Sequence, residues 1–310
     1  MNGAKQKPSW DFRQTIRENA LYLSLFSGLA LALSAALFAG PLLPWRDLPD
    51  HLALISLLDH ARVMGSVAND HYTIQWLPVP YWLFYGSVWL LARIMSWTAA
   101  LQVVALIGLL ATPIALGQLL KTVGRDSRWG LIAMPLFFNH NLMYGWLSYC
   151  LGIPVLLMTL AATIKLLDKK GSPKALAAWA CLLFLAHAQL AALYAVLVVY
   201  LVFGPQAGTI TKRLKRLAWP LAAPVILGLP WVIARLVGQH NRGEVTDGAA
   251  VIFHDPVTRL KRLPDFLTNS WGGHLDDWMG LATIAVIILL ARLPNQRSLS
   301  ASKPAGRVAS

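Results

Sequence analysis

The stretch 20–43, ALYLSLFSGLALALSAALFAGPLL, decides the fold class because it is apolar almost throughout. A helix needs about 20 such residues to cross the hydrocarbon core of a bilayer. The run is longer than the roughly 7–15 residues that form the core of a signal peptide, and no clean cleavage site follows it. We therefore interpret it as an uncleaved first transmembrane helix.

Similar apolar runs recur along the chain. The 310 residues are 56% hydrophobic and only 13% charged, whereas a soluble domain carries about 25% charged residues. This composition excludes a single water-soluble globule and a disordered chain. Because backbone polar groups in lipid must be satisfied within the segment, the runs predict helices. The expected fold is all-α, a polytopic integral membrane bundle of about eight transmembrane helices. After the first, the runs are 79–95, 97–120, 131–144, 146–167, 175–203, 219–237 and 278–290.

The distribution of charge predicts how the bundle is oriented. The net charge of +13 is concentrated partly in 1–19, 205–217 and the tail after 290, which are basic and are expected to be cytoplasmic. Loops 44–78 and 238–277 contain ten of the fourteen acids and are expected outside. The predicted organisation is a cytoplasmic N-terminus (1–19), a transmembrane domain (20–293) and a disordered cytoplasmic tail (294–310). Positive-inside bias explains many of the bases, so nucleic-acid binding is not expected.

Two short loops conflict with this scheme. Loops 121–129 and 168–174 are both net basic, which favours the cytoplasmic side, but simple helix counting puts them outside. If both loops were cytoplasmic instead, 79–120 would have to cross the membrane once and 175–203 would have to cross it twice. The latter run has 29 residues, and two full spans need about 40. The simple count is therefore the sequence prediction.

The first outer loop carries a polar cluster, Arg46-Asp47-Leu48-Pro49-Asp50-His51. A carboxylate at a membrane surface can act as a general base or hold a divalent cation, and Arg46 or His51 can contact a phosphate. Two structural alternatives remain open: Asp50 as a helix N-cap after Pro49, and Asp47 paired with Arg46 in a turn. From His51 onward, an apolar stripe predicts a short amphipathic helix lying on the membrane; it consists of Leu54, Ile55, Leu58 and Ala61.

Other polar groups are candidate contacts for a phosphate or a polar headgroup. The run Arg259-Leu260-Lys261-Arg262 in the second outer loop can attract a lipid phosphate or remain a solvated basic turn. His140 and His187 interrupt apolar runs, where polar groups are costly unless they face other helices or a wet cavity. Helix–helix hydrogen bonding is favoured for His140, and the two interpretations are balanced for His187.

In order and pattern the chain resembles the GT-C superfamily of polytopic glycosyltransferases. The resemblance lies in a first helix followed by an outer loop, 44–80, that begins with Asp47, Asp50 and His51 and continues along the membrane. Pro78-Val79-Pro80-Tyr81-Trp82 also looks like that family's entry into its second helix. The chain shows Asp-x-x-Asp where the family usually has Asp-x-Asp, Glu-x-Asp or an adjacent acidic pair, and it is short after residue 205.

The resemblance implies transfer of a sugar from a polyprenyl-phosphate donor to an acceptor at the extracytoplasmic face of a membrane, as in a bacterial inner (plasma) membrane. It implies Asp50, with Asp47 beside it, as catalytic base. Divalent Mg²⁺ or Mn²⁺ on Asp47 and Asp50 would stabilise the leaving phosphate, with contacts from Arg46, His51, His187, Arg259, Lys261 and Arg262. The alternatives are a transporter or flippase-like protein and a non-catalytic assembly scaffold. Membrane lipid is an expected partner, and nothing in the pattern specifies an oligomeric state.

Overall fold

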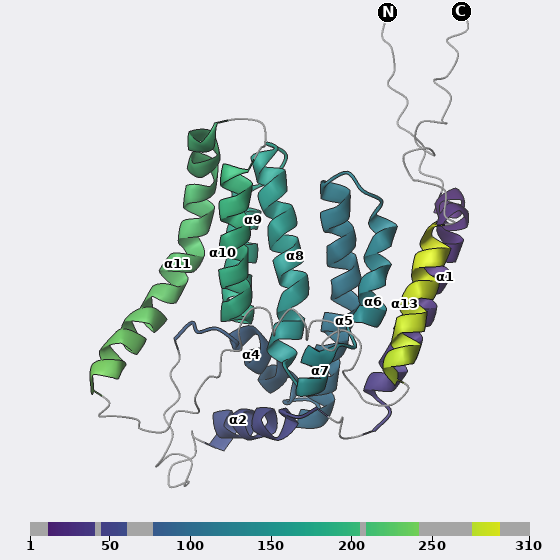
Figure 1. The fold of residues 1–310 in the computed structure, drawn as a ribbon. Helices are drawn as coiled ribbons and strands as arrows, with labels where there is room; N and C mark the ends of the chain where they lie inside the picture. Colours follow the sequence, from purple (N-terminus) through teal and green to yellow (C-terminus); the bar gives the residue numbers. More distant parts are fainter. Residues whose placement is uncertain (1–11, 41–44, 61–76, 205–208, 242–274, 292–310) are drawn as a thin grey trace, which may run out of the picture.

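The computed structural model describes residues 12–40, 45–60, 77–204, 209–241 and 275–291, and every regular element within those ranges is a helix (Figure 1). This agrees with the expected all-α class. Four helical segments are long and apolar enough to cross a membrane: the 20–37 part of α1 (Phe12–Leu37), α5 (Trp97–Thr122), α8 (Leu147–Leu167) and the 210–234 part of α11 (Ile210–Asn241). The shortest of them has 18 residues, which gives a length of about 27 Å at 1.5 Å per residue.

Three predicted spans are broken in the structure. In place of 79–95 there is only α4 (Trp82–Leu91), and in place of 131–144 there are η1 (Ser127–Ile132), α6 (Ala133–Leu136) and α7 (His140–Tyr144). The run 175–203 is split into α9 (Pro173–Ala186) and α10 (Ala188–Phe203). The last described helix, α13 (Leu275–Ala291), agrees with the predicted run 278–290 and packs against η1 and α6.

Local chemistry explains these breaks. The side chain of Asn139 accepts hydrogen bonds from the backbone of Asn141 and Leu142, which starts α7 afresh after α6. Gly145, in the left-handed conformation (φ 86°), then ends α7. His187 adopts an extended conformation (φ −165°, ψ 126°), so the chain leaves α9 there and begins α10. Hydrophobic composition alone does not reveal any of these turns.

The segment 175–203 runs along the bundle and back. His187 lies close to Gly152 near the start of α8, so α9 is antiparallel to α8. The α10 helix then returns alongside α8, where the Tyr194 hydroxyl lies 2.7 Å from Oγ1 of Thr163. The ends of α10 and α8 lie near each other, at the start of α11. There Arg213 donates to the Val202 carbonyl at the end of α10, and Arg216 donates to the Leu167 carbonyl at the end of α8.

The arrangement of the helices differs from the simple count: α5 alone carries 79–120 from one end of the bundle to the other, and 175–203 reverses at His187. Loops 121–129 and 168–174 consequently share one end with the start of α11. We call this the basic end; a pocket there is lined by Val123, Asp168 and Thr209. The opposite end, which we call the motif end, contains α2 (Leu48–His60), α4 and α7 (Figure 1).

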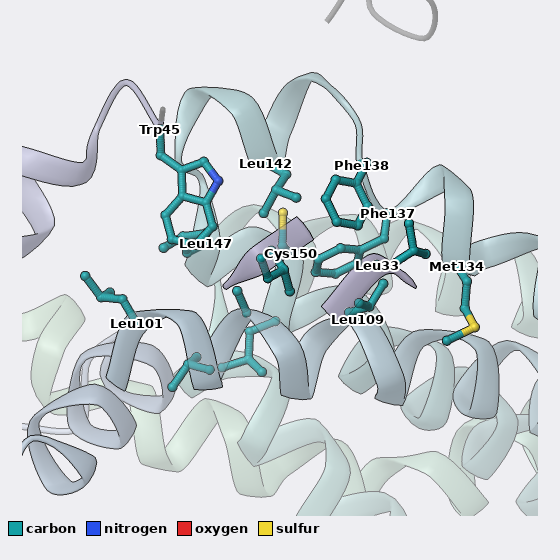
Figure 2. Packing of buried hydrophobic residues seen from close by; sticks show 14 of the residues in the cluster. Leu33, Trp45, Leu101, Leu109, Met134, Phe137, Phe138, Leu142, Leu147 and Cys150 are labelled. Carbon is teal, nitrogen blue, oxygen red and sulfur yellow. The ribbon is translucent and has the colours of Figure 1, made fainter. Parts of the chain in front are cut away.

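Two clusters of buried apolar side chains hold the helices together. One surrounds α5 and includes Leu101, Leu109, Phe137, Leu147 and Cys150 (Figure 2). The other joins α8, α9 and α10 through residues such as Leu176, Leu183 and Leu190. Glycines permit the closest approaches: a Cβ added at Gly130 would lie 2.6 Å from the backbone nitrogen of Gly117. Small residues commonly allow this close packing in helical membrane proteins.

Candidate functional site

The acidic motif is fixed by backbone pairing with α7 at the motif end. The backbone N–H groups of Arg46 and Asp47 donate to the carbonyls of Met143 (3.1 Å) and Tyr144 (3.0 Å). Gly145 follows directly, and a Cβ added to it would lie 3.1 Å from the Asp47 nitrogen and 3.2 Å from its Cβ. A glycine is thus needed at 145 both for its left-handed backbone and for the close passage of the motif.

The two carboxylates lie at the start of α2. The helix begins at Leu48, so Asp50 belongs to its first turn and the prediction that Asp50 is the N-cap is wrong. Asp47 directly precedes the helix and is half-buried, whereas Asp50 is exposed. The positive end of the helix dipole stabilises negative charge at both positions. Neither carboxylate makes a hydrogen bond or an ion pair to another described residue.

Arg46 does not pair with Asp47 in the described structure. Its guanidinium carbon lies 5.1 Å from the centre of the Tyr144 ring, which is a cation–π arrangement. The ring of His140 also stacks on Tyr144, with 4.2 Å between the two ring centroids. The turn with an Arg46–Asp47 ion pair, one of the structural alternatives, is therefore not formed.

His51 is the buried centre of the site. Its Nε2 lies 2.6 Å from the carbonyl oxygen of Gly145, and its Nδ1 lies 3.0 Å from the Tyr85 hydroxyl. Because a carbonyl only accepts, Nε2 carries a proton; in the neutral ring Nδ1 then accepts from the Tyr85 hydroxyl. Both nitrogens are occupied, so a phosphate or cation could reach His51 only by displacing Tyr85 or Gly145.

Tyr85 lies on α4, which is too short to cross a membrane. Burial raises the pKa of Tyr85 to about 12, and the negative charges of Asp50 and Asp47 add to this effect. The phenol therefore stays neutral and available as the donor to His51.

The apolar face of α2 differs from the predicted stripe. Leu48, His51 and Ile55 are buried against the bundle, whereas Leu54 is 47% exposed. A helix lies where one was predicted, but its buried face does not include Leu54, and His51 on that face contacts Tyr85 and Gly145. Asp59 near the far end of α2 accepts hydrogen bonds from Trp89 Nε1 (2.8 Å) and from Arg93. The α2 helix is thus held at both ends.

His187 joins the same region through α4. Its ring meets the rings of Tyr81 and Tyr149 edge to face, with centroids 4.9 and 5.3 Å away. It is buried, and its Nδ1 has no hydrogen-bond partner among the described residues. Tyr81 has an uncommon positive φ of 77° at the start of α4, and backbone strain of this kind clusters at functional sites.

Tyr81 and Tyr85 link the two histidines, and the sequence patterns did not single them out. Tyr85 lies in α4, and Tyr81 is the residue directly before that helix. Tyr81 contacts His187 and Tyr85 contacts His51, so the start of α4 supplies a partner to each histidine. The signal in the sequence was the pair of tyrosines after Pro78-Val79-Pro80, but their partners could not be read from it.

Several predicted groups lie outside the described residues or outside this cluster. Arg259, Lys261 and Arg262 belong to 242–274, which the structure does not describe. Within the described ranges, no three His, Cys, Asp or Glu side chains are grouped as a metal site. Asp47 and Asp50 alone supply two carboxylates, which suits Mg²⁺ only if a substrate phosphate completes the coordination.

No protein-family model, curated protein or solved structure matches the chain. The GT-C resemblance therefore stays a prediction from the residues of the first outer loop. What is established is an all-helical chain, in its described part, with four helices long and apolar enough to cross a membrane.

Proposed function

We propose that the protein is a membrane glycosyltransferase that moves a sugar from a polyprenyl-phosphate donor to an acceptor at the extracytoplasmic face. The observation that carries the proposal is the state of Asp47 and Asp50. Backbone bonds to α7 fix their position, yet neither carboxylate is bonded to another described residue. Asp47 is half-buried and Asp50 is exposed, so we propose that both carboxylates are free to meet a substrate.

The charges at the two ends support an orientation with the motif end outside. Within 45–60 and 77–93 at the motif end, the charged residues are Arg46 and Arg93 with Asp47, Asp50 and Asp59. At the basic end Asp126 and Asp168 accompany many bases: Lys121, Arg125, Arg128, Lys165, Lys169, Lys170, Lys174, Lys212, Arg213, Lys215 and Arg216. Because Lys and Arg collect in cytoplasmic loops, we infer that the basic end and both termini are cytoplasmic.

This orientation gives eight passes by a different route from the simple count. The passes are α1, α5, the η1–α6–α7 segment, α8, α9, α10, α11 and α13. The α4 helix stays at the motif end, and α2 lies along the outer surface with its exposed Leu54 directed towards lipid headgroups. Short helices such as α9 can cross because thinning of the bilayer accommodates a shortfall in length at modest cost.

In the proposed reaction Asp50 accepts the proton of the acceptor hydroxyl. The acceptor oxygen then forms a bond to the anomeric carbon, and the bond from that carbon to the phosphate oxygen breaks, which releases polyprenyl phosphate. We assign the base to Asp50 because an acceptor can reach its exposed carboxylate, while the half-buried Asp47 is better placed to orient the acceptor or to share a cation. The His51–Tyr85 pair holds the motif in place.

The departing phosphate needs positive charge. Arg46, which lies over Tyr144, is the described cation that directly precedes the first carboxylate in the chain. We propose that Arg46 meets the phosphate, with Arg259, Lys261, Arg262 and His187 as further contacts. Mg²⁺ or Mn²⁺, if bound, would be held by Asp47 and Asp50 and would neutralise charge on the phosphate. Electrostatic stabilisation of developing charge usually contributes more to the rate than any other single effect in such chemistry.

The test is transfer by purified, reconstituted protein supplied with polyprenyl-phosphate sugars, with products identified by mass spectrometry. Asp50→Asn should lower turnover by about 10²–10⁴-fold, the usual contribution of a general base. Asp59→Asn is the matched control on the same helix: it removes a carboxylate that binds Trp89 and Arg93, so it loosens the far end of α2 without removing the proposed base, and turnover should fall far less than in Asp50→Asn. Unchanged turnover in Asp50→Asn would remove Asp50 from the mechanism. No donor consumption by the unaltered protein would favour a non-catalytic scaffold or transporter.

A further inference from the structure

A second candidate site lies at the basic end, far from the acidic motif. The ends of α5, α8 and α10 and the start of α11 enclose a cavity of about 680 Å³. That volume falls within the roughly 300–1,000 Å³ typical of small-molecule sites. Its polar lining includes Lys169, Lys212, Arg213 and Arg216 with one acid, Asp168. The cavity is therefore strongly cationic.

The two arginines are already committed to the fold. Arg213 is only 6% exposed and donates to the carbonyls of Val202 (2.8 Å) and Gly204 (2.9 Å) at the end of α10. Arg216 donates through Nη1 to the carbonyl of Leu167 at the end of α8 (2.7 Å). These bonds offset the negative ends of two helix dipoles, which would otherwise repel an anion from the cavity.

Lys169 occupies a position that is normally glycine. It follows the end of α8 with a left-handed backbone (φ 62°), and the N–H of Lys170 closes the turn on the carbonyl of Lys165 (2.8 Å). Side chains other than glycine are disfavoured in this conformation. The lysine at this strained position places an exposed amine beside the cavity.

The remaining walls are apolar. Val123, Ile164 and Leu201 line the cavity, so it offers a hydrocarbon surface next to a cluster of cations. A free inorganic anion would gain nothing from these walls, whereas an amphiphile would use both. Basic cavities between transmembrane helices near the membrane surface are suited to anionic lipid headgroups.

We propose that this cavity binds the phosphate of an anionic phospholipid. Lys169 and Lys212 contact the phosphate oxygens, Arg216 reinforces the positive field, and the start of an acyl chain lies along Val123, Ile164 and Leu201. The proposal does not depend on glycosyl transfer, since it concerns the opposite end of the bundle. It assigns the basic end a specific lipid partner in addition to its general attraction for anionic membranes.

The experiment is native mass spectrometry of the detergent-solubilised full chain, titrated with phosphatidylglycerol, phosphatidylcholine or inorganic phosphate. Phosphatidylglycerol should bind at least about tenfold more tightly than phosphatidylcholine, and millimolar phosphate should not displace it. The double variant Lys169→Gln/Lys212→Gln should bind phosphatidylglycerol about 25-fold more weakly, since each lysine near an anionic headgroup contributes about a factor of five. The control Lys174→Gln/Lys215→Gln removes the same charge from exposed positions at the basic end that do not line the cavity.

Equal weakening in the two double variants would overturn the proposal, because it would show attraction to the whole basic end. Displacement of the lipid by an equal concentration of inorganic phosphate would assign the cavity to soluble anions instead.

A third variant, Lys169→Gly, relieves the left-handed strain while removing the amine. It should raise the unfolding temperature yet bind phosphatidylglycerol about fivefold more weakly. Wild-type affinity in Lys169→Gly would contradict the role of Lys169.

Discussion

Gly145 is the residue on which the geometry of the acidic motif depends. Its left-handed backbone ends α7, its carbonyl accepts the hydrogen bond from His51 Nε2, and its missing side chain makes room for Asp47. The end of α7, the hydrogen bond to His51 and the close approach of Asp47 therefore all depend on Gly145. A substitution there disturbs the candidate site without changing any of the proposed reacting groups.

We predict that Gly145→Ala destabilises the protein by about 2 kcal/mol, because a left-handed alanine costs roughly 1–2 kcal/mol. Its Cβ would also press on Asp47 at 3.1–3.2 Å. Gly28→Ala is the control, because a Cβ there meets nothing within 4 Å; in a helix interior it should be neutral or stabilising by about 0.5–1 kcal/mol. Reversible unfolding in mixed micelles measures both. Equal stability of the two variants would show that Gly145 is not conformationally required.

At the scale of an element, α2 is fastened to α4 through Asp59. Burial of the carboxyl opposes ionisation, but hydrogen bonds from Arg93 and Trp89 outweigh it and lower the pKa of Asp59 below its ordinary 3.8. A carboxyl whose pKa is lower in the folded state contributes stability above its unfolded pKa. That contribution is lost as the pH falls through the lower, folded value.

We therefore expect the far end of α2 to loosen only below a pH of about 3.8. A nitroxide label at Leu54, which is exposed on α2, should become more mobile in that acidic range. In Asp59→Asn the label should already be more mobile at neutral pH, and its mobility should change less on acidification. The titration runs from about pH 6 to about pH 2, which brackets the ordinary aspartate pKa. A wild-type label whose mobility is constant over that range would show that the Asp59 contacts do not hold α2.

At the scale of the whole molecule, the separation of charge between the two ends predicts which residues face the outside. The reversal at His187 brings the turn after α8 to the same end as the start of α11 (Figure 1). The simple count from hydropathy would place that turn on the opposite side. Labelling from outside the cell therefore distinguishes the two arrangements.

We predict that a cysteine at Leu54 reacts with a membrane-impermeant maleimide in intact cells and that a cysteine at Lys170 reacts only after lysis. Both positions are exposed. The native Cys150, which is buried, and Cys181, which is partly buried, are first replaced by alanine. Labelling of both positions from outside would restore the simple helix count and overturn the proposed orientation.

The sequence by itself determined the all-α class, the helices α1, α5, α8 and α11, and the adjacency of Asp47, Asp50 and His51. Those features depend on composition and on neighbours within a few residues, and local patterns report such neighbours well. Local patterns were less accurate for α2, which starts at Leu48 and leaves Leu54 exposed. Which face of a helix is buried depends on the other helices that pack against it, and a local pattern does not report them.

Only the tertiary structure decided which end of the bundle each loop occupies and which side chains complete the site. Hydropathy measures the length of an apolar run. It does not show that the chain reverses direction at His187, in the middle of the apolar run 175–203. The bond from His51 to Gly145 joins residues 94 positions apart, and the contact of Tyr81 with His187 spans a similar distance along the chain. Contacts of that range arise from the packing of whole helices, so no local pattern in the chain could have specified them.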